Sequence, residues 1–229
     1  MRAGVFLPLH GYDRQGRYCF LVRLAQLSPS TMQAENCFKV FIMMVRNGNH
    51  LISPFCNICL KPQFALTMEG NRQANTKGMC MIVDMEGMTV SHATMMTPTL
   101  LKKLVVLFLE TYPLDNDTLT ELSRLYFLNM PKLLEKLFAL FLSFLNKRVR
   151  KTISLQDKNC PVLLAELGEE ILPAGYGGTN TNTGDLTEFW LKEMVRQSAW
   201  LAGELQFRTD ETARVGKDRL SGRLSCSVM

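Results

Sequence analysis

A continuous apolar run in the middle of the chain limits the folds that this sequence can adopt. Residues 79–85 read Met-Cys-Met-Ile-Val-Asp-Met, so the apolar run ends at Asp84, and Gly78 and Gly87 bound the stretch. A strand with one face in water alternates apolar and polar residues, whereas a strand buried on both faces is almost entirely apolar. The run therefore predicts a strand inside a sheet that is covered on both faces.

Other strand and helix patterns alternate along the chain. Short stretches rich in β-branched and aromatic residues predict strands, and apolar residues spaced three and four apart predict helices. Because parallel strands need long crossover connections, this alternation predicts an α/β fold with a mostly parallel sheet covered by helices. The predicted strands are residues 17–25, 79–85, 125–128 and 153–155. The predicted helices are residues 32–45, 91–97, 98–112, 131–145, 162–167 and 186–205.

The domain organisation follows from where these patterns stop. Residues 46–77 show no sustained period, so we expect a long loop there, inserted at about residues 47–76. We expect a compact domain over residues 1–178, an amphipathic helix within residues 179–205 and a polar, disordered tail over residues 206–229. A chain of 229 residues, 47% of them hydrophobic, can bury a core of that size.

Composition and targeting signals restrict the partners of the chain. No apolar run reaches the ~18–20 residues that span a bilayer, and residues 1–10 lack the features of a signal peptide. We therefore expect a cytoplasmic protein whose seven scattered cysteines are reduced. The mild net charge of +5 indicates no nucleic-acid partner.

The sequence shows no assembled catalytic or metal-binding motif. Cys56 and Cys59 form a lone CxxC, without a second pair at zinc spacing. The nucleophile motif Gly-x-Ser-x-Gly is absent, and residues 175–178 lack the Lys-Ser/Thr of a phosphate loop. We therefore expect no enzymatic activity, no metal and no cofactor.

Short motifs follow one another along the chain in a recognisable order. The set begins with Asp13-x-x-Gly16-Arg17, and the central strand with its turn, residues 78–87, follows. The later members are Ser91-His92, Thr97-Pro98, Lys102-Lys103, Tyr112-Pro113, Phe127-Leu128-Asn129-x-Pro131, Phe144-Leu145, Leu172-Pro173 and Tyr176-Gly177-Gly178. From about residue 4 to residue 178 the ordered set resembles the CRAL-TRIO family, which includes retinaldehyde-binding and α-tocopherol transfer proteins. The helix and tail that follow look like those of arthropod relatives.

The resemblance implies a sheet floor and a helical gate around an apolar cavity. Such a protein binds and transfers a tocopherol-like or retinoid-like molecule or a phospholipid, and we expect it to be a monomer. Apolar periodicity alone would favour ordinary core packing for the same side chains. The lining implied by the resemblance is Met79, Met81, Val83, Met96, Leu104, Leu107, Phe108, Tyr112, Leu125, Phe127, Phe141, Phe144 and Leu145.

The densest basic cluster lies at the end of the predicted gate helix. It consists of Lys147, Arg148, Arg150 and Lys151. Several members of the family bind phosphoinositide head groups in a basic cleft beside the gate. The resemblance therefore implies a phosphatidylinositol bisphosphate site here and transient contact with anionic membranes. A solvated helix end stabilised by the helix dipole would show the same pattern.

Three departures from the family leave an alternative open. The family's N-terminal helical subdomain is missing, residues 47–64 have no counterpart, and residues 115–121 place acids where relatives often carry Lys or Arg. The alternative is a truncated interaction protein of the same family that binds no lipid.

A lipidation motif ends the sequence. Cys226-Ser227-Val228-Met229 matches C-a-a-X with a terminal Met, which favours a farnesyl group on Cys226. Ser227 is not aliphatic, so coincidence is the alternative. One lipid chain gives weak attachment, so we expect nearby basic residues to assist it.

Overall fold

The computed structural model describes seven stretches of the chain. They are residues 4–26, 71–95, 97–99, 101, 124–145, 147–157 and 160–199. The helix predicted over residues 32–45, most of the one over residues 98–112 and the tail over residues 206–229 lie outside these stretches.

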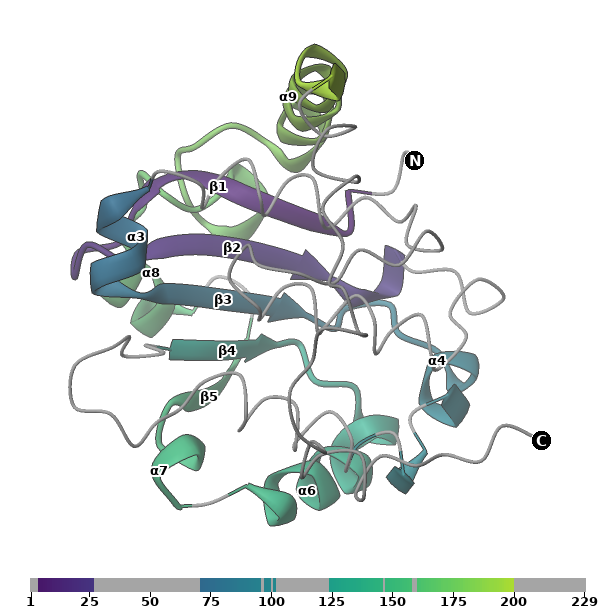
Figure 1. Ribbon diagram of the computed structural model, residues 1–229. Helices are drawn as coiled ribbons and strands as arrows, with labels where there is room; N and C mark the ends of the chain where they lie inside the picture. Colours follow the sequence, from purple (N-terminus) through teal and green to yellow (C-terminus); the bar gives the residue numbers. More distant parts are fainter. Residues whose placement is uncertain are drawn as a thin grey trace, which may run out of the picture.

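A five-stranded sheet in the order β1-β2-β3-β4-β5 forms the centre of the described part (Figure 1). β1 and β2 are antiparallel, and the pairs β2–β3, β3–β4 and β4–β5 are parallel. The mostly parallel sheet is therefore confirmed, and the apolar run forms its middle strand. The strands are β1 Phe6–Tyr12, β2 Tyr18–Arg23, β3 Met79–Asp84, β4 Arg124–Leu128 and β5 Ile153–Gln156.

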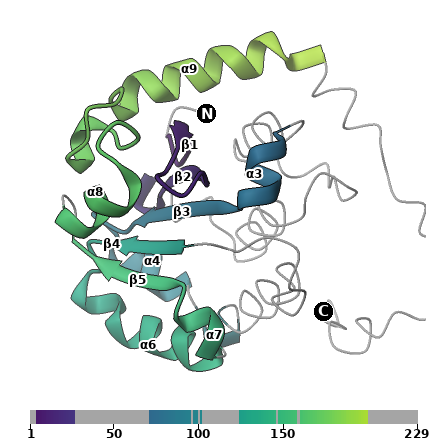
Figure 2. The same ribbon diagram turned by 90° about the vertical axis from the view of Figure 1, so that its left-hand side faces the viewer.

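Helices surround this sheet in both views (Figures 1 and 2). α9 lies beyond β1, whereas α6 and α7 lie at the β4–β5 end of the sheet. The α-helices are α3 Arg72–Lys77, α4 Val90–Met95, α6 Glu135–Phe144, α7 Lys147–Arg150, α8 Pro161–Leu167 and α9 Thr183–Arg196. The 3-10 helices are η1 Leu24–Gln26, η2 Lys132–Leu134 and η3 Ala174–Tyr176.

The two faces of the sheet bury different sets of side chains, because alternate residues of a strand point to opposite sides. One face packs against η2, α6 and α7, and we call it the apolar face. The opposite face packs against α8, η3 and α9. On strands β2 to β5 the apolar face consists of Tyr18, Phe20, Val22, Met79, Met81, Val83, Leu125, Phe127, Ile153 and Leu155.

The structure corrects three expectations about the elements. A strand, β1, begins at Phe6, where the sequence predicted none. Its Pro8 obscures the strand pattern, yet proline is tolerated because β1 is an edge strand. The loop predicted over residues 46–77 ends in a helix, α3, at Arg72. Helix α9 begins at Thr183 rather than residue 186, since the Asn182 side chain accepts hydrogen bonds from the first turn.

Candidate functional site

The apolar face gathers the described members of the predicted ligand-binding set. All eight of them belong to one apolar cluster: Met79, Met81, Val83, Leu125, Phe127, Phe141, Phe144 and Leu145. The other predicted members, Met96, Leu104, Leu107, Phe108 and Tyr112, lie outside the described residues.

Strand register explains why residues far apart in the sequence meet on this face. Met81 lies opposite Phe20 on one side and Leu125 on the other. Val83 is flanked in the same way by Val22 and Phe127. Parallel pairing thus places every second residue of three strands in one continuous apolar surface.

Aromatic rings continue this surface from the sheet onto α6. The ring centroids of Phe127 and Phe138 lie 4.8 Å apart, and those of Phe127 and Phe141 lie 6.5 Å apart. Phe127 and Met81 are only half-buried although both lie on inner strands. Accessible apolar surface at the middle of a sheet is the kind of surface that an apolar ligand covers.

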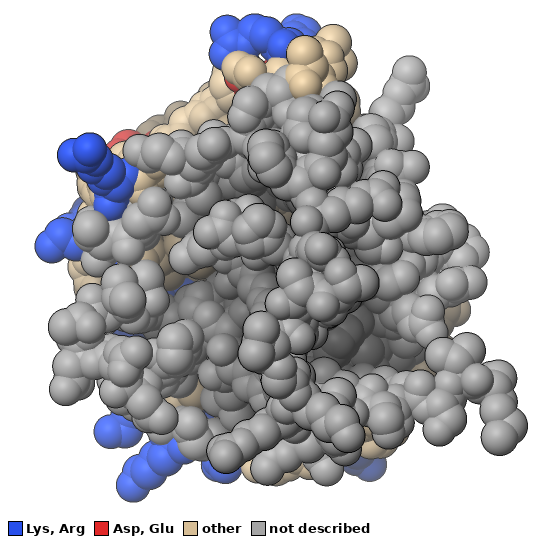
Figure 3. All heavy atoms as spheres, in the orientation of Figure 1, with Lys and Arg blue, Asp and Glu red and all other residues tan. Residues whose placement is uncertain are grey.

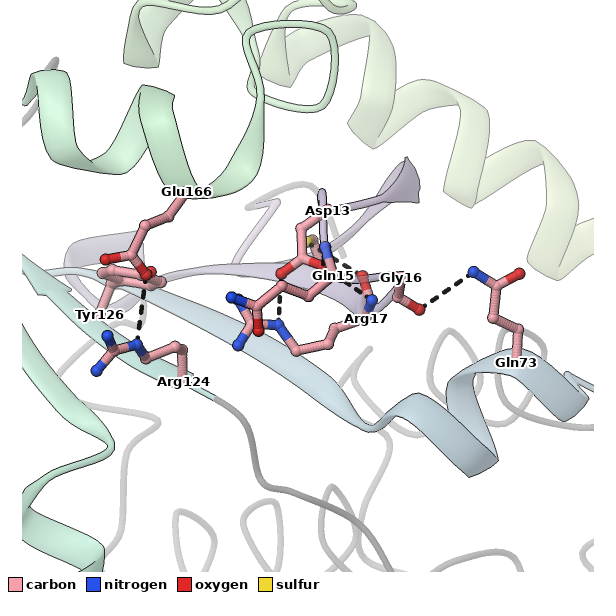
Figure 4. A network of polar contacts seen from close by, with 9 residues as sticks. Asp13, Gln15, Gly16, Arg17, Gln73, Arg124, Tyr126 and Glu166 are labelled. Carbon is pink, nitrogen blue, oxygen red and sulfur yellow. Dashed lines mark hydrogen bonds and ion pairs between the residues drawn. The ribbon is translucent and has the colours of Figure 1, made fainter.

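Charged groups gather on the opposite side of the strands. Figure 4 shows one network, in which Arg17 Nε donates to Asp13 Oδ2 at 2.5 Å. Burial lowers the pKa of the Arg17 guanidinium, but the hydrogen bond and the charge of Asp13 outweigh it and raise the pKa overall. Nearby, Tyr126 donates to Glu166, which also pairs with Arg124 at 3.3 Å. Burial and the bond to Glu166 raise the pKa of Tyr126.

A second polar cluster joins the carboxyl end of β3 to the η3 segment. Tyr176 Oη donates to Asp84 Oδ2 at 2.6 Å, and Asn129 Nδ2 donates to Asp84 Oδ1 at 3.0 Å. Gly178 lies against the backbone of Leu172. A Cβ at this position would be only 1.9 Å from the Leu172 carbonyl oxygen, so only glycine fits. These contacts account for three motif members, Asp84, Tyr176 and Gly178, as structural residues.

Two buried cysteines and an aspartate meet in a cluster that the sequence analysis missed. One ligand atom each from Asp13, Cys19 and Cys80 lies within 4.8 Å of the others. Asp13 already accepts hydrogen bonds from the amides of Gln15 and Arg17 and from the Arg17 side chain. Burial raises the pKa of the Cys80 thiol and so disfavours the thiolate that binds metals. We therefore interpret this cluster as structural.

The basic cluster lies beside the apolar face. Val149 of α7 is 1% exposed and packs into the apolar cluster, while Lys147, Arg150 and Lys151 are exposed. Arg150 Nε donates to the carbonyl oxygen of Leu145 at 2.9 Å. Arg148 also belongs to α7. Lys and Arg side chains are visible along the lower edge of the space-filling view, where α6 and α7 lie in Figure 1 (Figure 3).

Two other predicted features lie outside the described residues, namely the CxxC at Cys56 and Cys59 and the lipidation motif at Cys226. Within the described part of the chain, no helix has the length and apolar character to cross a membrane.

Comparisons with known proteins point to one family. The family model described as "CRAL/TRIO domain" matches residues 2–178. The mouse protein "Alpha-tocopherol transfer protein-like" (Mus musculus) is 23% identical over 109 residues, which are 48% of this chain and 30% of that protein. Rat "Clavesin-1" (Rattus norvegicus) is 23% identical over 142 residues, which are 62% of this chain and 38% of that protein. The chain thus spans only about a third of the length of these relatives.

A solved structure gives the same picture of the fold. "Crystal structure of Sfh5" aligns with a TM-score of 0.51 at 16% sequence identity, covering 86% of this chain and 66% of that one. At this identity the likeness concerns the fold alone.

Proposed function

The chain belongs to the CRAL/TRIO domain family, and from this premise we propose that it binds and transfers a hydrophobic small molecule held on its apolar face. Proteins of this family bind and transfer lipophilic ligands and are generally not enzymes. The ligand classes that suit the proposal are a tocopherol-like or retinoid-like molecule and a phospholipid.

One observation carries the proposal, namely the separation of side chains between the two faces of the sheet. Every residue that β3 and β4 place on the apolar face is apolar: Met79, Met81, Val83, Leu125 and Phe127. The charged residues of the same two strands, Asp84 and Arg124, lie on the opposite face. A lipid tail needs a dry apolar wall, and methionine adapts to irregular ligand shapes.

Native mass spectrometry of the full chain purified from eukaryotic cells tests this proposal. We expect a fraction of the protein to carry a bound lipid, which organic extraction releases chemically unchanged. A folded protein that carries no lipid and takes none up from mixed lipid vesicles would contradict the proposal. That result would favour the alternative, an interaction protein of the same family that binds no lipid.

We further propose that Lys147, Arg148, Arg150 and Lys151 contact phosphoinositide head groups while the protein exchanges ligand with a membrane. Three observations support this: the cluster is basic, its described side chains are exposed, and Val149 holds α7 against the apolar face. A bisphosphate head group can accept several charge-assisted hydrogen bonds from such a cluster.

Changing all four basic residues to Gln is expected to weaken binding to phosphatidylcholine vesicles that contain phosphatidylinositol bisphosphate by at least tenfold. Each basic residue near an anionic membrane contributes about 1 kcal/mol, and tenfold corresponds to about 1.4 kcal/mol. Vesicle sedimentation measures the effect, and high salt should reproduce it in the unchanged protein. A matched control changes the exposed Lys192 and Arg196 of α9 to Gln and should leave binding within about twofold. Salt-insensitive binding by the fourfold variant would contradict the assignment.

A further inference from the structure

The apolar face of strands β2 to β5 carries a single hydroxyl, that of Tyr18. The other residues of this face are Phe, Val, Met, Leu and Ile. Because successive side chains of a strand point to opposite faces, the nearby charged residues Arg23, Asp84 and Arg124 lie on the other face. A ligand lying on these four strands therefore meets one strong hydrogen-bonding group and no charge.

The Tyr18 hydroxyl differs from the other described tyrosine hydroxyls in having no partner among the described residues. Tyr12 donates to Asn71 at 3.0 Å, Tyr126 to Glu166, and Tyr176 to Asp84. Among the described residues, Arg17 Nη2 is the one side-chain nitrogen or oxygen that is fully enclosed and has no hydrogen-bond partner. The Tyr18 hydroxyl is therefore not fully enclosed by the protein.

Packing holds the Tyr18 ring in place while its hydroxyl stays available. Tyr18 is 9% exposed, and its ring makes edge-to-face contacts with Phe20 and Tyr12, at centroid distances of 5.1 Å and 5.5 Å. Burial, with a smaller contribution from Tyr12, raises the pKa of the Tyr18 phenol. The group is therefore a neutral hydrogen-bond donor at physiological pH.

We propose that the Tyr18 hydroxyl anchors the polar end of the bound lipid and that this end is an uncharged oxygen, in an alcohol, phenol or carbonyl. The inference rests on the proposed function, because it needs a lipid on the apolar face. On this face the strands themselves offer a charged head group no countercharge, and burying an unpaired charge is costly. A neutral oxygen needs only the one donor that Tyr18 provides.

A pair of probes that differ in one oxygen tests the anchor. Full-length protein is stripped of lipid, and tritiated hexadecanol or heptadecane is partitioned between the protein and phosphatidylcholine vesicles. Tyr18→Phe is expected to weaken hexadecanol binding about two- to twelvefold and to leave heptadecane binding unchanged, since a hydrogen bond contributes about 0.5–1.5 kcal/mol and about 1.4 kcal/mol is tenfold. The matched control, Tyr12→Phe, removes a hydroxyl that bonds Asn71 and should leave the preference for hexadecanol intact.

The possible outcomes separate this inference from the proposed function. If both probes bind and Tyr18→Phe weakens both equally or neither, the anchor is wrong while lipid binding stands. If the unchanged protein prefers hexadecyl phosphate to hexadecanol, the uncharged head group is wrong. If it binds no probe at all, the proposed function fails and the anchor with it. Should Tyr18→Phe not fold, the unchanged protein must still prefer hexadecanol to heptadecane, and equal binding would overturn the anchor.

Discussion

Replacing Asp13 with Ala is expected to lower the free energy of unfolding by about 3–5 kcal/mol, the cost of leaving a buried charge without its partner. Arg17 is 3% exposed and Asp13 is 5% exposed, so water cannot replace the lost carboxylate. The change also removes the acceptor of two backbone amides in the turn before β2. Urea denaturation followed by circular dichroism measures the loss.

Two variants show whether the buried charge is the cause. Arg14→Ala changes an exposed residue of the same turn and should cost less than about 1 kcal/mol. Adding Arg17→Met to Asp13→Ala removes the unpaired charge and should recover part of the loss. A cost for Asp13→Ala no larger than that of Arg14→Ala would show that the ion pair contributes little.

Phe141→Asp is expected to reduce lipid retention by more than tenfold. Phe141 belongs to the apolar cluster and extends the aromatic surface of Phe127 onto α6. In the proposed ligand site a carboxylate at this position would be buried against the lipid, and burying it costs more than the about 1.4 kcal/mol that corresponds to tenfold. The measurement is the fraction of protein with bound lipid in native mass spectrometry.

The control for this change is Phe189→Asp. Phe189 is 45% exposed on α9, a helix that packs on the side of the sheet away from the apolar face, so this variant should retain lipid like the unchanged protein. Thermal unfolding of both variants checks that each is folded. If Phe141→Asp is folded and retains lipid equally well, α6 does not line the ligand site.

The local residue pattern was sufficient to predict the inner strands but not the elements at the edges of the fold. The run over residues 79–85 is apolar because both faces of β3 are buried, so burial is visible in the sequence itself. β1 was missed because Pro8 interrupts its pattern and because its place in the sheet comes from pairing with β2. The short helix α3 was missed because six residues are too few to show a helical period.

The candidate site was likewise predictable from the sequence only in part. Alternation along each strand predicts which residues share a face, and the resemblance named eight side chains that the fold brings into one cluster. The hydrogen bond between Tyr176 and Asp84 joins residues that are 92 positions apart in the sequence, so no local pattern could predict it.

The sequence by itself determined the fold class, the buried middle strand and the division of its side chains between two faces, because these depend on local periodicity and on burial of apolar groups. Only the tertiary structure decided which polar groups are satisfied. It pairs Asp13 with Arg17, Tyr176 with Asp84 and Tyr126 with Glu166, and it leaves the Tyr18 hydroxyl without a partner among the described residues. A hydrogen bond needs its donor and acceptor atoms about 2.5–3.2 Å apart, and for residues of separate elements packing sets that distance.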